Sequence, residues 1–214
     1  MGTERLDTEA RREQIVQAAL GLIARDGLNQ LSMARLARQV GLTPSALYRH
    51  YESKDAIIEA ILSQMRGMLL TNVNVVCRET ADPVERLHKL LFLHVKLVRE
   101  NEGLPRVLLS QEVYAGHPER RRMLYENISA YLGKVAKIIE EGQRQGRIRG
   151  NAQPDVLSVM FLGLIQPAAL LWQMSEGEFD VTAHVKKAWK VFRETIAVSS
   201  GASEQDGDTA PNPQ

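Results

Sequence analysis

The stretch from Ser32 to Lys54 reads SMARLARQVGLTPSALYRHYESK, and it carries the strongest fold signal in this 214-residue chain. Ser32 is a good N-cap, because its hydroxyl can accept a hydrogen bond from a free backbone N–H in the first turn of a helix. Gly41 lies where the chain needs a left-handed residue to leave that helix. Thr43 can cap a second helix that starts at Pro44, where a missing N–H costs nothing. The stretch therefore predicts two short helices joined by a tight turn.

The spacing within this stretch predicts a particular motif. A helix-turn-helix needs a small residue where its helices cross, a glycine in the turn and an apolar anchor on the second helix. Ala37 lies four residues before Gly41, and Leu47 lies six residues after it. An ordinary helical hairpin with a solvated basic face is the alternative. Because cap, turn and anchor agree, we expect a helix-turn-helix over 32–51 with a recognition helix at 44–51.

The directions of the side chains indicate how the recognition helix would be used. Leu47 and Tyr51 are four residues apart and share the face that should pack inward. The opposite face would enter the major groove of DNA, where Arg49 could bind guanine O6 and N7 and Ala46 could meet a thymine methyl. Residues around its rim carry donors suited to phosphate oxygens. The candidate DNA contacts are Ser32, Arg35, Thr43, Pro44, Ser45, Ala46, Tyr48, Arg49, His50 and Lys54.

Residues 9 to 62 resemble the N-terminal domain of the tetracycline-repressor (TetR/AcrR) family of bacterial transcriptional regulators. The most specific part of the resemblance is the block LYRHY at 47–51, followed by Ser53 and Lys54. Residues 141–148, ahead of a long apolar helix, are similar to the regulatory domain of many members. The resemblance implies an all-helical homodimer that responds to a ligand and usually represses transcription.

The composition is that of a globular protein, with 44% hydrophobic and 25% charged residues. A net charge of +1 is no nucleic-acid signature, but four Lys or Arg oppose one acidic residue between residues 32 and 54. Such a local basic patch suits site-specific DNA binding. The single Cys77 excludes an internal disulfide, and residues 1–14 are too polar for the core of a signal peptide. We therefore expect a cytoplasmic protein.

Apolar residues recur at helical spacing along most of the chain, and no alternation predicts a strand. The expected fold is all-α with about nine helices. They cover 8–26, 32–40, 44–51, 53–72, 83–98, 103–114, 117–145, 155–176 and 180–198. We expect frayed residues at 1–7, a DNA-binding domain at 8–54 and a regulatory, ligand-binding and dimerisation domain at 55–198. The Gly/Ser/Pro-rich, acidic segment 199–214 is expected to be disordered.

The segment 156–175 has no formal charge and is long enough to cross a membrane. The Gln166-Pro167 pair at its centre and its acidic flanks argue against a span. A helix that is apolar all round can equally be buried inside a protein. We expect this helix and the one at 180–198 to form a four-helix dimer interface, with an intramolecular core as the alternative. The interface candidates are Leu164, Leu171, Val185, Trp189 and Phe192.

No motif predicts a catalytic site, a cofactor or a metal centre, so we expect no enzyme activity. His94 shares an apolar stripe with Leu87, Leu91 and Val98, and a buried histidine needs a partner. That partner is either a polar group of the core or a ligand. Met and Leu richness in the C-terminal half fits either a simple core or an adaptable apolar pocket. The candidate pocket residues are His94, Tyr125, Asn127, Phe161 and Gln166.

Together these features predict a homodimeric transcriptional regulator, with repression as the expected output. It would bind a palindromic operator in double-stranded DNA and respond to a small apolar or amphipathic effector, without a membrane partner. The alternative is a DNA-bound adaptor whose C-terminal domain docks a protein partner instead of a small ligand.

Overall fold

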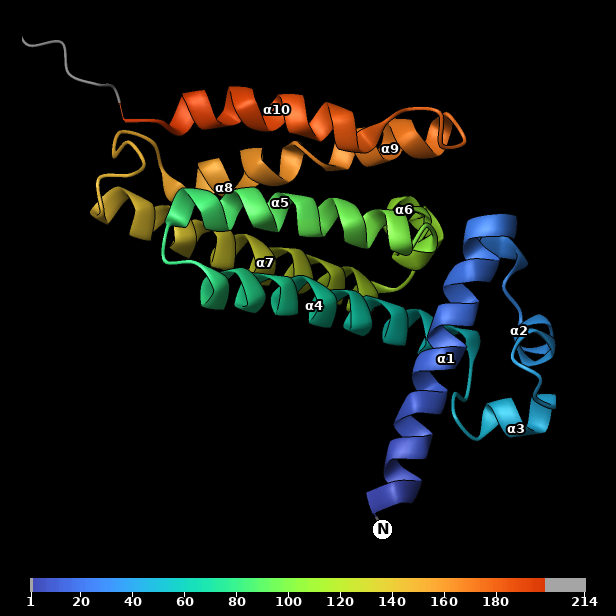
Figure 1. The fold of residues 1–214 in the computed structure, drawn as a ribbon. Helices are drawn as coiled ribbons and strands as arrows, with labels where there is room; N and C mark the ends of the chain where they lie inside the picture. Colours follow the sequence, from blue (N-terminus) through green and yellow to red (C-terminus); the bar gives the residue numbers. More distant parts are fainter. Residues whose placement is uncertain (1, 199–214) are drawn as a thin grey trace, which may run out of the picture.

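The computed structural model describes the backbone of residues 2–198 and the side chains of residues 8–198. Within residues 2–198 the chain forms ten α-helices, two short 3-10 helices and no strand (Figure 1). The helices are α1 (Gly2–Asp26), α2 (Met33–Gln39), α3 (Pro44–Tyr48), α4 (Lys54–Glu79), α5 (Pro83–Glu100), α6 (Gly103–Leu109), α7 (Pro118–Arg144), α8 (Pro154–Gly163), α9 (Gln166–Met174) and α10 (Val181–Ile196); the 3-10 helices are η1 (Leu28–Gln30) and η2 (Gln111–Val113).

The first three helices form a small bundle at one end of the molecule, which we call the head (Figure 1). The helix caps and the glycine turn that the sequence predicted here are confirmed. The Ser32 hydroxyl accepts from the Arg35 amide at 3.3 Å, and the Thr43 hydroxyl accepts from the Ala46 amide at 3.2 Å. Gly41 has a φ of +69° and links α2 to α3. The fully buried Leu47 anchors α3 in the core, so the chain contains the expected helix-turn-helix.

Three expected boundaries in this half of the chain are wrong. The helix α1 begins at Gly2 rather than at residue 8, and residues 3–12 contain no Gly or Pro to interrupt it. The recognition helix ends at Tyr48, and the amide of His50 reaches back only three residues, to the Leu47 carbonyl at 2.9 Å. Tyr51 still packs inward as expected, 4% exposed and beneath the Arg12 guanidinium. The helix α4 continues to Glu79 rather than residue 72, because Val73 and Val76 extend its buried stripe.

The remaining helices form the body. Helices α4, α5 and α7 run alongside one another, and α8, α9 and α10 cover them (Figure 1). The helix expected at 155–176 is two helices, which is why the count is ten. Pro167 has no N–H to bond to the preceding turn, and the amides of Leu164 and Ile165 reach back only three residues. The expected tail, 199–214, lies outside the described residues.

By length and composition alone, Pro154–Met174 could span a membrane, and it is the only such segment among the described residues. In the fold it is interrupted between α8 and α9, and one face packs into the body through Leu157, Phe161 and Ala168. Its other face carries apolar side chains that the described chain leaves exposed.

The head touches the body through a close approach of α1 to α6. A Cβ atom on Gly103 would lie 2.3 Å from the backbone carbonyl oxygen of Leu20. Only glycine therefore allows the start of α6 to lie directly on the α1 backbone. Helix α4 provides the second connection, because it leaves the head at Lys54 and runs the length of the body.

Candidate DNA interface and effector cavity

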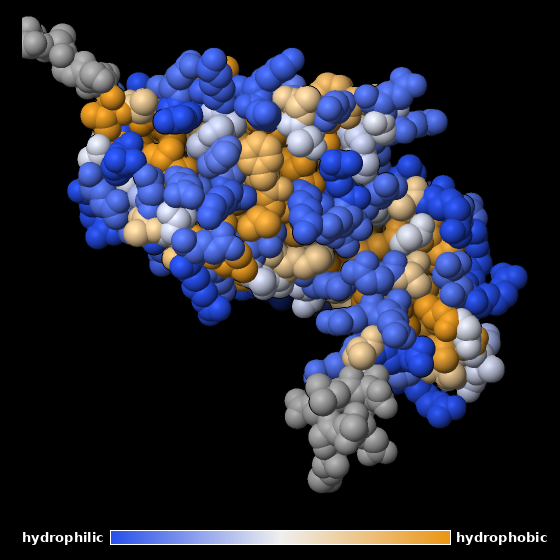
Figure 2. Space-filling model, in the orientation of Figure 1, coloured by the Kyte–Doolittle hydropathy of each residue, from blue (hydrophilic) through white to orange (hydrophobic). Residues whose placement is uncertain are grey.

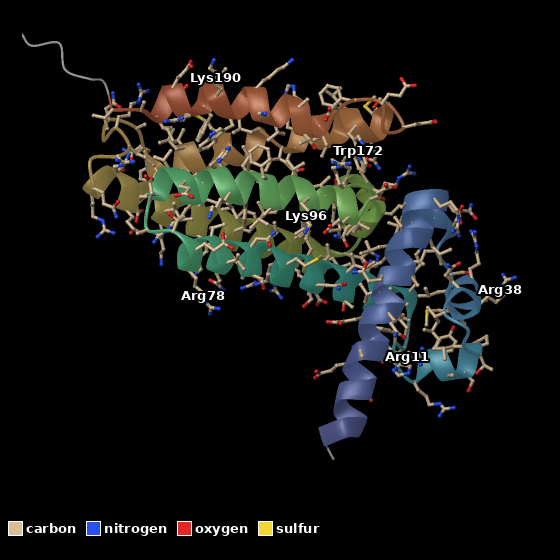
Figure 3. The ribbon with its side chains drawn as sticks, in the orientation of Figure 1. Arg11, Arg38, Arg78, Lys96, Trp172 and Lys190 are labelled. Atoms are coloured by element: carbon tan, nitrogen blue, oxygen red, sulfur yellow. The ribbon has the colours of Figure 1, made fainter. Side chains whose placement is uncertain are left out.

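The outer face of α3 is available for contact. Pro44, Ser45, Tyr48 and Arg49 are exposed, Ala46 and His50 are partly exposed, and Leu47 points into the core. No described residue forms an ion pair or hydrogen bond with the guanidinium of Arg49 or of Arg38, which Figure 3 labels on α2. A long unpaired guanidinium beside small side chains can reach the floor of a major groove.

Arg35 has a structural role that the sequence did not indicate. Its guanidinium forms a 2.5 Å ion pair with Asp26 at the end of α1 and donates to the Gln30 carbonyl at 3.1 Å. A hydrogen bond from Arg25 and the charges of Arg25 and Arg35 lower the pKa of Asp26. Arg35 therefore links α1 to α2 within the head. A phosphate contact would have to use the guanidinium N–H groups that remain.

Lys54 is also engaged within the head. Its Nζ donates to the Leu28 carbonyl at 3.0 Å, which ties the start of α4 to η1. An ammonium group has three donors, so two remain for a phosphate oxygen. The Ser53 hydroxyl caps the same helix by accepting from the Ala56 amide at 3.1 Å. The N-terminus of α4 thus presents a positive side chain and a helix end together.

The body contains a partly open cavity of about 250 Å³, lined by parts of α4 through α9. Most of its wall is apolar, formed by Met65 and Leu69 of α4, leucines of α5 and α6, and Leu124 and Ile128 of α7. Its polar groups come from His94, Tyr131 and Gln166. An apolar cavity with a few convergent polar groups is typical of a small-molecule site.

His94 and Tyr131 meet at the cavity wall. The His94 Nδ1 and the Tyr131 hydroxyl are 3.2 Å apart, and both side chains are buried. Burial lowers the pKa of His94 to about 4 and raises the pKa of Tyr131. Both groups are therefore neutral near pH 7. No described residue is within hydrogen-bonding reach of the second ring nitrogen, Nε2. This pair suits an uncharged polar group of a ligand.

Two of the five expected pocket residues, His94 and Gln166, line this cavity, and the other three do not. Tyr125 is 72% exposed, because it lies six positions before Tyr131 and so faces away from it. Asn127 donates to the Leu62 carbonyl at 2.9 Å and accepts from Arg66 at 3.4 Å, outside the cavity. Phe161 belongs to the core and stacks near Phe192. Tyr131 was missed because nothing in the local sequence pairs it with His94.

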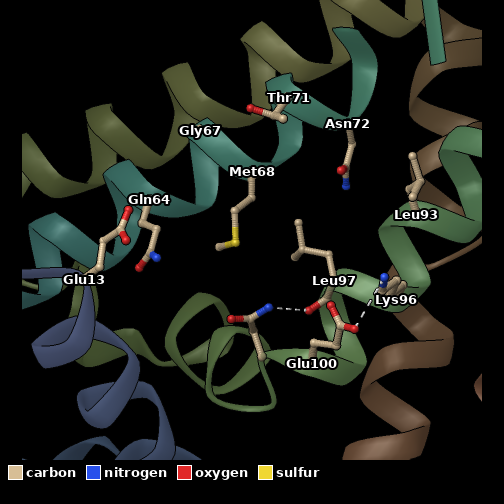
Figure 4. A pocket seen from close by; sticks show the side chains of 11 residues that line it. Glu13, Gln64, Gly67, Met68, Thr71, Asn72, Leu93, Lys96, Leu97 and Glu100 are labelled. Atoms are coloured by element: carbon tan, nitrogen blue, oxygen red, sulfur yellow. Dashed lines mark hydrogen bonds and ion pairs between the residues drawn. The ribbon is translucent and has the colours of Figure 1, made fainter. Parts of the chain in front are cut away.

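A second hollow of about 450 Å³ lies between α1, α4 and α5, where the head meets the body (Figure 4). Its lining is largely polar, and much of it is paired within the chain: Asn101 donates to the Leu97 carbonyl, and Lys96 lies 3.7 Å from Glu100. The Gln64 Oε1 is buried without a partner among the described residues. On this side, the head is separated from the body rather than packed tightly against it.

The expected dimer residues of α10 are part of the subunit's own core. Val185, Trp189 and Phe192 are at most 7% exposed within the subunit and face α5 and the interior, as the intramolecular alternative expects. Leu164 is partly buried and Leu171 is 46% exposed. Other apolar side chains of α8, α9 and α10 are exposed within the described chain: Val156, Val159, Met160, Leu170, Leu171, Met174 and Val191. The helical spacing of apolar residues on α10 correctly predicted that one face of this helix is buried. It did not reveal which helices that face packs against.

A helix-turn-helix displayed at one end of a helical body with its own apolar cavity defines the class of DNA-binding regulators with a separate regulatory domain. The family profile described as "Bacterial regulatory proteins, tetR family" matches residues 15–61, and a "Tetracyclin repressor-like, C-terminal domain" matches residues 80–196. The chain therefore belongs to the TetR family of DNA-binding transcriptional regulators and is not an enzyme.

Known proteins are similar to this chain over most of its length. A nucleoid occlusion factor, SlmA, of Vibrio campbellii is 26% identical over 190 residues, 87% of this chain and 95% of that protein. The fatty acid metabolism regulator protein of Bacillus subtilis is 24% identical over 170 residues, 79% of this chain and 87% of that protein.

Solved structures share the fold. FadR from Bacillus subtilis in complex with stearoyl-CoA has a TM-score of 0.74 at 22% identity, covering 86% of this chain and 98% of that chain. A putative transcriptional regulator from Saccharomonospora viridis in complex with choline has a TM-score of 0.76 at 22% identity, covering 89% and 99%.

Proposed function

We propose that this protein is a homodimeric repressor that binds a palindromic operator and releases it when an amphipathic effector enters the cavity. The observation that carries the proposal is the neutral His94–Tyr131 pair in an otherwise apolar cavity. The cavity walls include α4 and α6, the body helices through which the head is attached.

On the DNA side, the exposed face of α3 would enter the major groove, with Arg49 and Ala46 contacting bases. Ser32, Arg35, Thr43, Pro44, Ser45, Tyr48, His50 and Lys54 would contribute phosphate contacts or the caps that orient them. A dimer places two such helices in successive major grooves if they are about 34–36 Å apart. Because DNA is the proposed partner, the protein would act in the cytoplasm beside the chromosome.

On the assembly side, the exposed apolar face of α8, α9 and Val191 would be covered by the same face of a second copy. A two-fold interface of this kind is self-complementary, so each apolar side chain contributes twice. Covering it would also remove from water the apolar side chains of α8, α9 and Val191 that the described chain leaves exposed.

Two routes connect the cavity to the head. Leu104 and Pro105 of α6 line the cavity, and Gly103 beside them lies on the backbone of Leu20. Met65 of α4 lines the cavity on the same helix that begins at Lys54. An effector that fits best when α6 and α4 are displaced would change the separation of the two heads. It would act only through its different affinity for the two arrangements.

The effector class follows from the lining. Apolar walls suit a hydrocarbon chain, and a neutral histidine and tyrosine suit a carbonyl or hydroxyl group rather than a charge. A relative's structure holds stearoyl-CoA, and we propose a fatty-acyl compound whose chain enters the cavity. The test is fluorescence anisotropy on a promoter fragment identified by genome-wide footprinting, with saturated acyl-CoAs of increasing chain length. Release that depends on chain length is expected; operator binding that no acyl-CoA alters would contradict the proposal.

The second candidate remains a DNA-bound adaptor whose body docks a protein partner instead of a small ligand; similarity to a nucleoid occlusion factor is compatible with it but does not favour it. The two candidates differ in one measurement. For an adaptor, filling the cavity leaves operator affinity unchanged, whereas a ligand-gated repressor loses affinity when the cavity is filled.

A further inference from the structure

A groove of about 960 Å³ lies between α10 and the start of α5. Hydrophobic surface lies between hydrophilic side chains over these helices in Figure 2, and Figure 3 labels Lys190 on α10. Val84, Trp189 and Ile196 contribute apolar lining. The groove is separate from the effector cavity and from the DNA-facing side of the head.

The groove has an excess of positive charge. Five cationic side chains line it, against only two acidic ones, Asp82 and Glu85. Both acidic residues are already engaged. Asp82 accepts from the amides of Val84 and Glu85 and from Arg147, and Glu85 accepts from the Thr80 hydroxyl at 2.9 Å.

The α10 cations, by contrast, have no carboxylate partner within the part of the chain that the structure describes. They are Lys186, Lys187, Lys190 and Arg193. Lys186 and Lys190 are four residues apart on one face, an arrangement of like charges that disfavours an isolated helix. Burial and the nearby charge of Arg193 also lower the pKa of His88, another lining residue. An anionic occupant would relieve this repulsion.

The sequence that follows the groove has the complementary charge. Residues 199–214 read SSGASEQDGDTAPNPQ, with acidic groups at Glu204, Asp206 and Asp208 and no Lys or Arg. Ala197 and Val198, immediately before this segment, line the end of the groove. Six residues of extended chain from Val198 can reach about 20 Å, whereas Lys190 lies about 9 Å of helix from Ile196. The acidic residues can therefore return to the α10 cations.

We propose that the acidic segment 204–208 binds within its own subunit to the cationic groove between α10 and α5. Individual surface ion pairs are weak, but tethering raises the local concentration of the segment to the millimolar range. The attachment is therefore electrostatic and sensitive to salt. It covers the groove beside Trp189 and neutralises a positive face that would otherwise attract other polyanions.

Paramagnetic relaxation in the full chain tests this. A nitroxide is attached at Thr209→Cys in a Cys77→Ser background, since Cys77 is the only cysteine and is exposed. We expect the amide signals of residues 186–193 to lose most of their intensity, while those of α2 do not. Raising NaCl from about 0.05 M to about 0.5 M should restore the amide signals of residues 186–193, because the added salt screens the attraction between the acidic segment and the α10 cations.

Matched variants distinguish specific binding of the acidic segment to the groove from non-specific contacts with the surface. Lys186→Glu with Lys190→Glu should abolish the broadening, and so should Glu204→Gln with Asp206→Asn and Asp208→Asn. Lys134→Glu with Lys137→Glu, exposed positions on α7, should leave it unchanged. Broadening that survives the α10 charge reversal or high salt, or that is spread evenly over the surface, would overturn the proposal.

Discussion

Arg120 of α7 pairs with Asp55 in the first turn of α4, with Nη2 and Oδ1 2.6 Å apart. The arginine side chain is 4% exposed, whereas the carboxylates of Asp55 and Glu59, which lies 3.6 Å from its Nε, are about half exposed. Helix α7 also lines the apolar cavity of the body through Leu124, and Asp55 lies directly after the head. This contact therefore joins the regulatory body to the segment that holds the recognition helix.

Arg120→Met should loosen the start of α4 without unfolding the protein. The apolar stem is retained, and the two carboxylates left behind can be solvated, so we expect the free energy of unfolding to change by at most about 1 kcal/mol. The amides of residues 55–59 should exchange with solvent several-fold faster. The control is Arg122→Met, whose exposed ion pair with Glu126 is 3.8 Å long. Unchanged exchange at residues 55–59 would show that the contact does not hold α4.

Arg49→Ala should weaken operator binding by about 1–3 kcal/mol and relax the preference at one base per half-site. Lys54→Ala should weaken binding to all sequences alike and reduce the salt slope by about one per subunit. Binding titrations on operator and scrambled DNA at several salt concentrations separate the two effects. If Arg49→Ala loses the same binding free energy on operator and on scrambled DNA, Arg49 contacts the phosphate backbone and not a base. Lys54→Arg, which keeps the charge, is the control for the lost hydrogen bond to Leu28.

Val159→Glu and Leu171→Glu should give monomers, because each introduces a charge into the proposed apolar interface. Their operator affinity should fall steeply, since one head supplies only half of the contacts. Val75→Glu, on the exposed side of α4, is the control for a surface charge. Sedimentation that finds intact dimers for both interface variants would place the interface elsewhere. Phe192→Glu should instead unfold the subunit, because its ring is 3% exposed.

Stability should fall as the pH drops from 6.5 to about 4. The unfolded chain protonates His94 near pH 6.5, but the folded protein does so only near pH 4. In this window the unfolded state binds more protons, so His94 costs about 3 kcal/mol of stability at the acid end. Denaturant unfolding of wild type and His94→Gln at pH 7 and near pH 4 measures this difference. If both proteins lose the same stability, His94 is not the titrating group.

His94→Leu should also raise the acyl-CoA concentration needed to release DNA, by about tenfold, because one hydrogen bond to the effector is lost. Tyr125→Leu is the matched control, since Tyr125 is 72% exposed and does not line the cavity. Anisotropy titrations with both variants give the comparison. Release of DNA by the His94 variant at the wild-type concentration would remove His94 from the ligand site.

The sequence by itself determined the helix-turn-helix and the all-helical fold. Ser32, Gly41 and Thr43 act on backbone groups within three or four residues, so their effect can be read locally. The tertiary structure decided which side chains meet across helices: Arg35 with Asp26, Lys54 with Leu28 and His94 with Tyr131. It also decided that the α10 stripe is buried within the subunit. Periodicity reveals that a helix has an apolar face, but only the crossing of helices distant in sequence determines what that face covers.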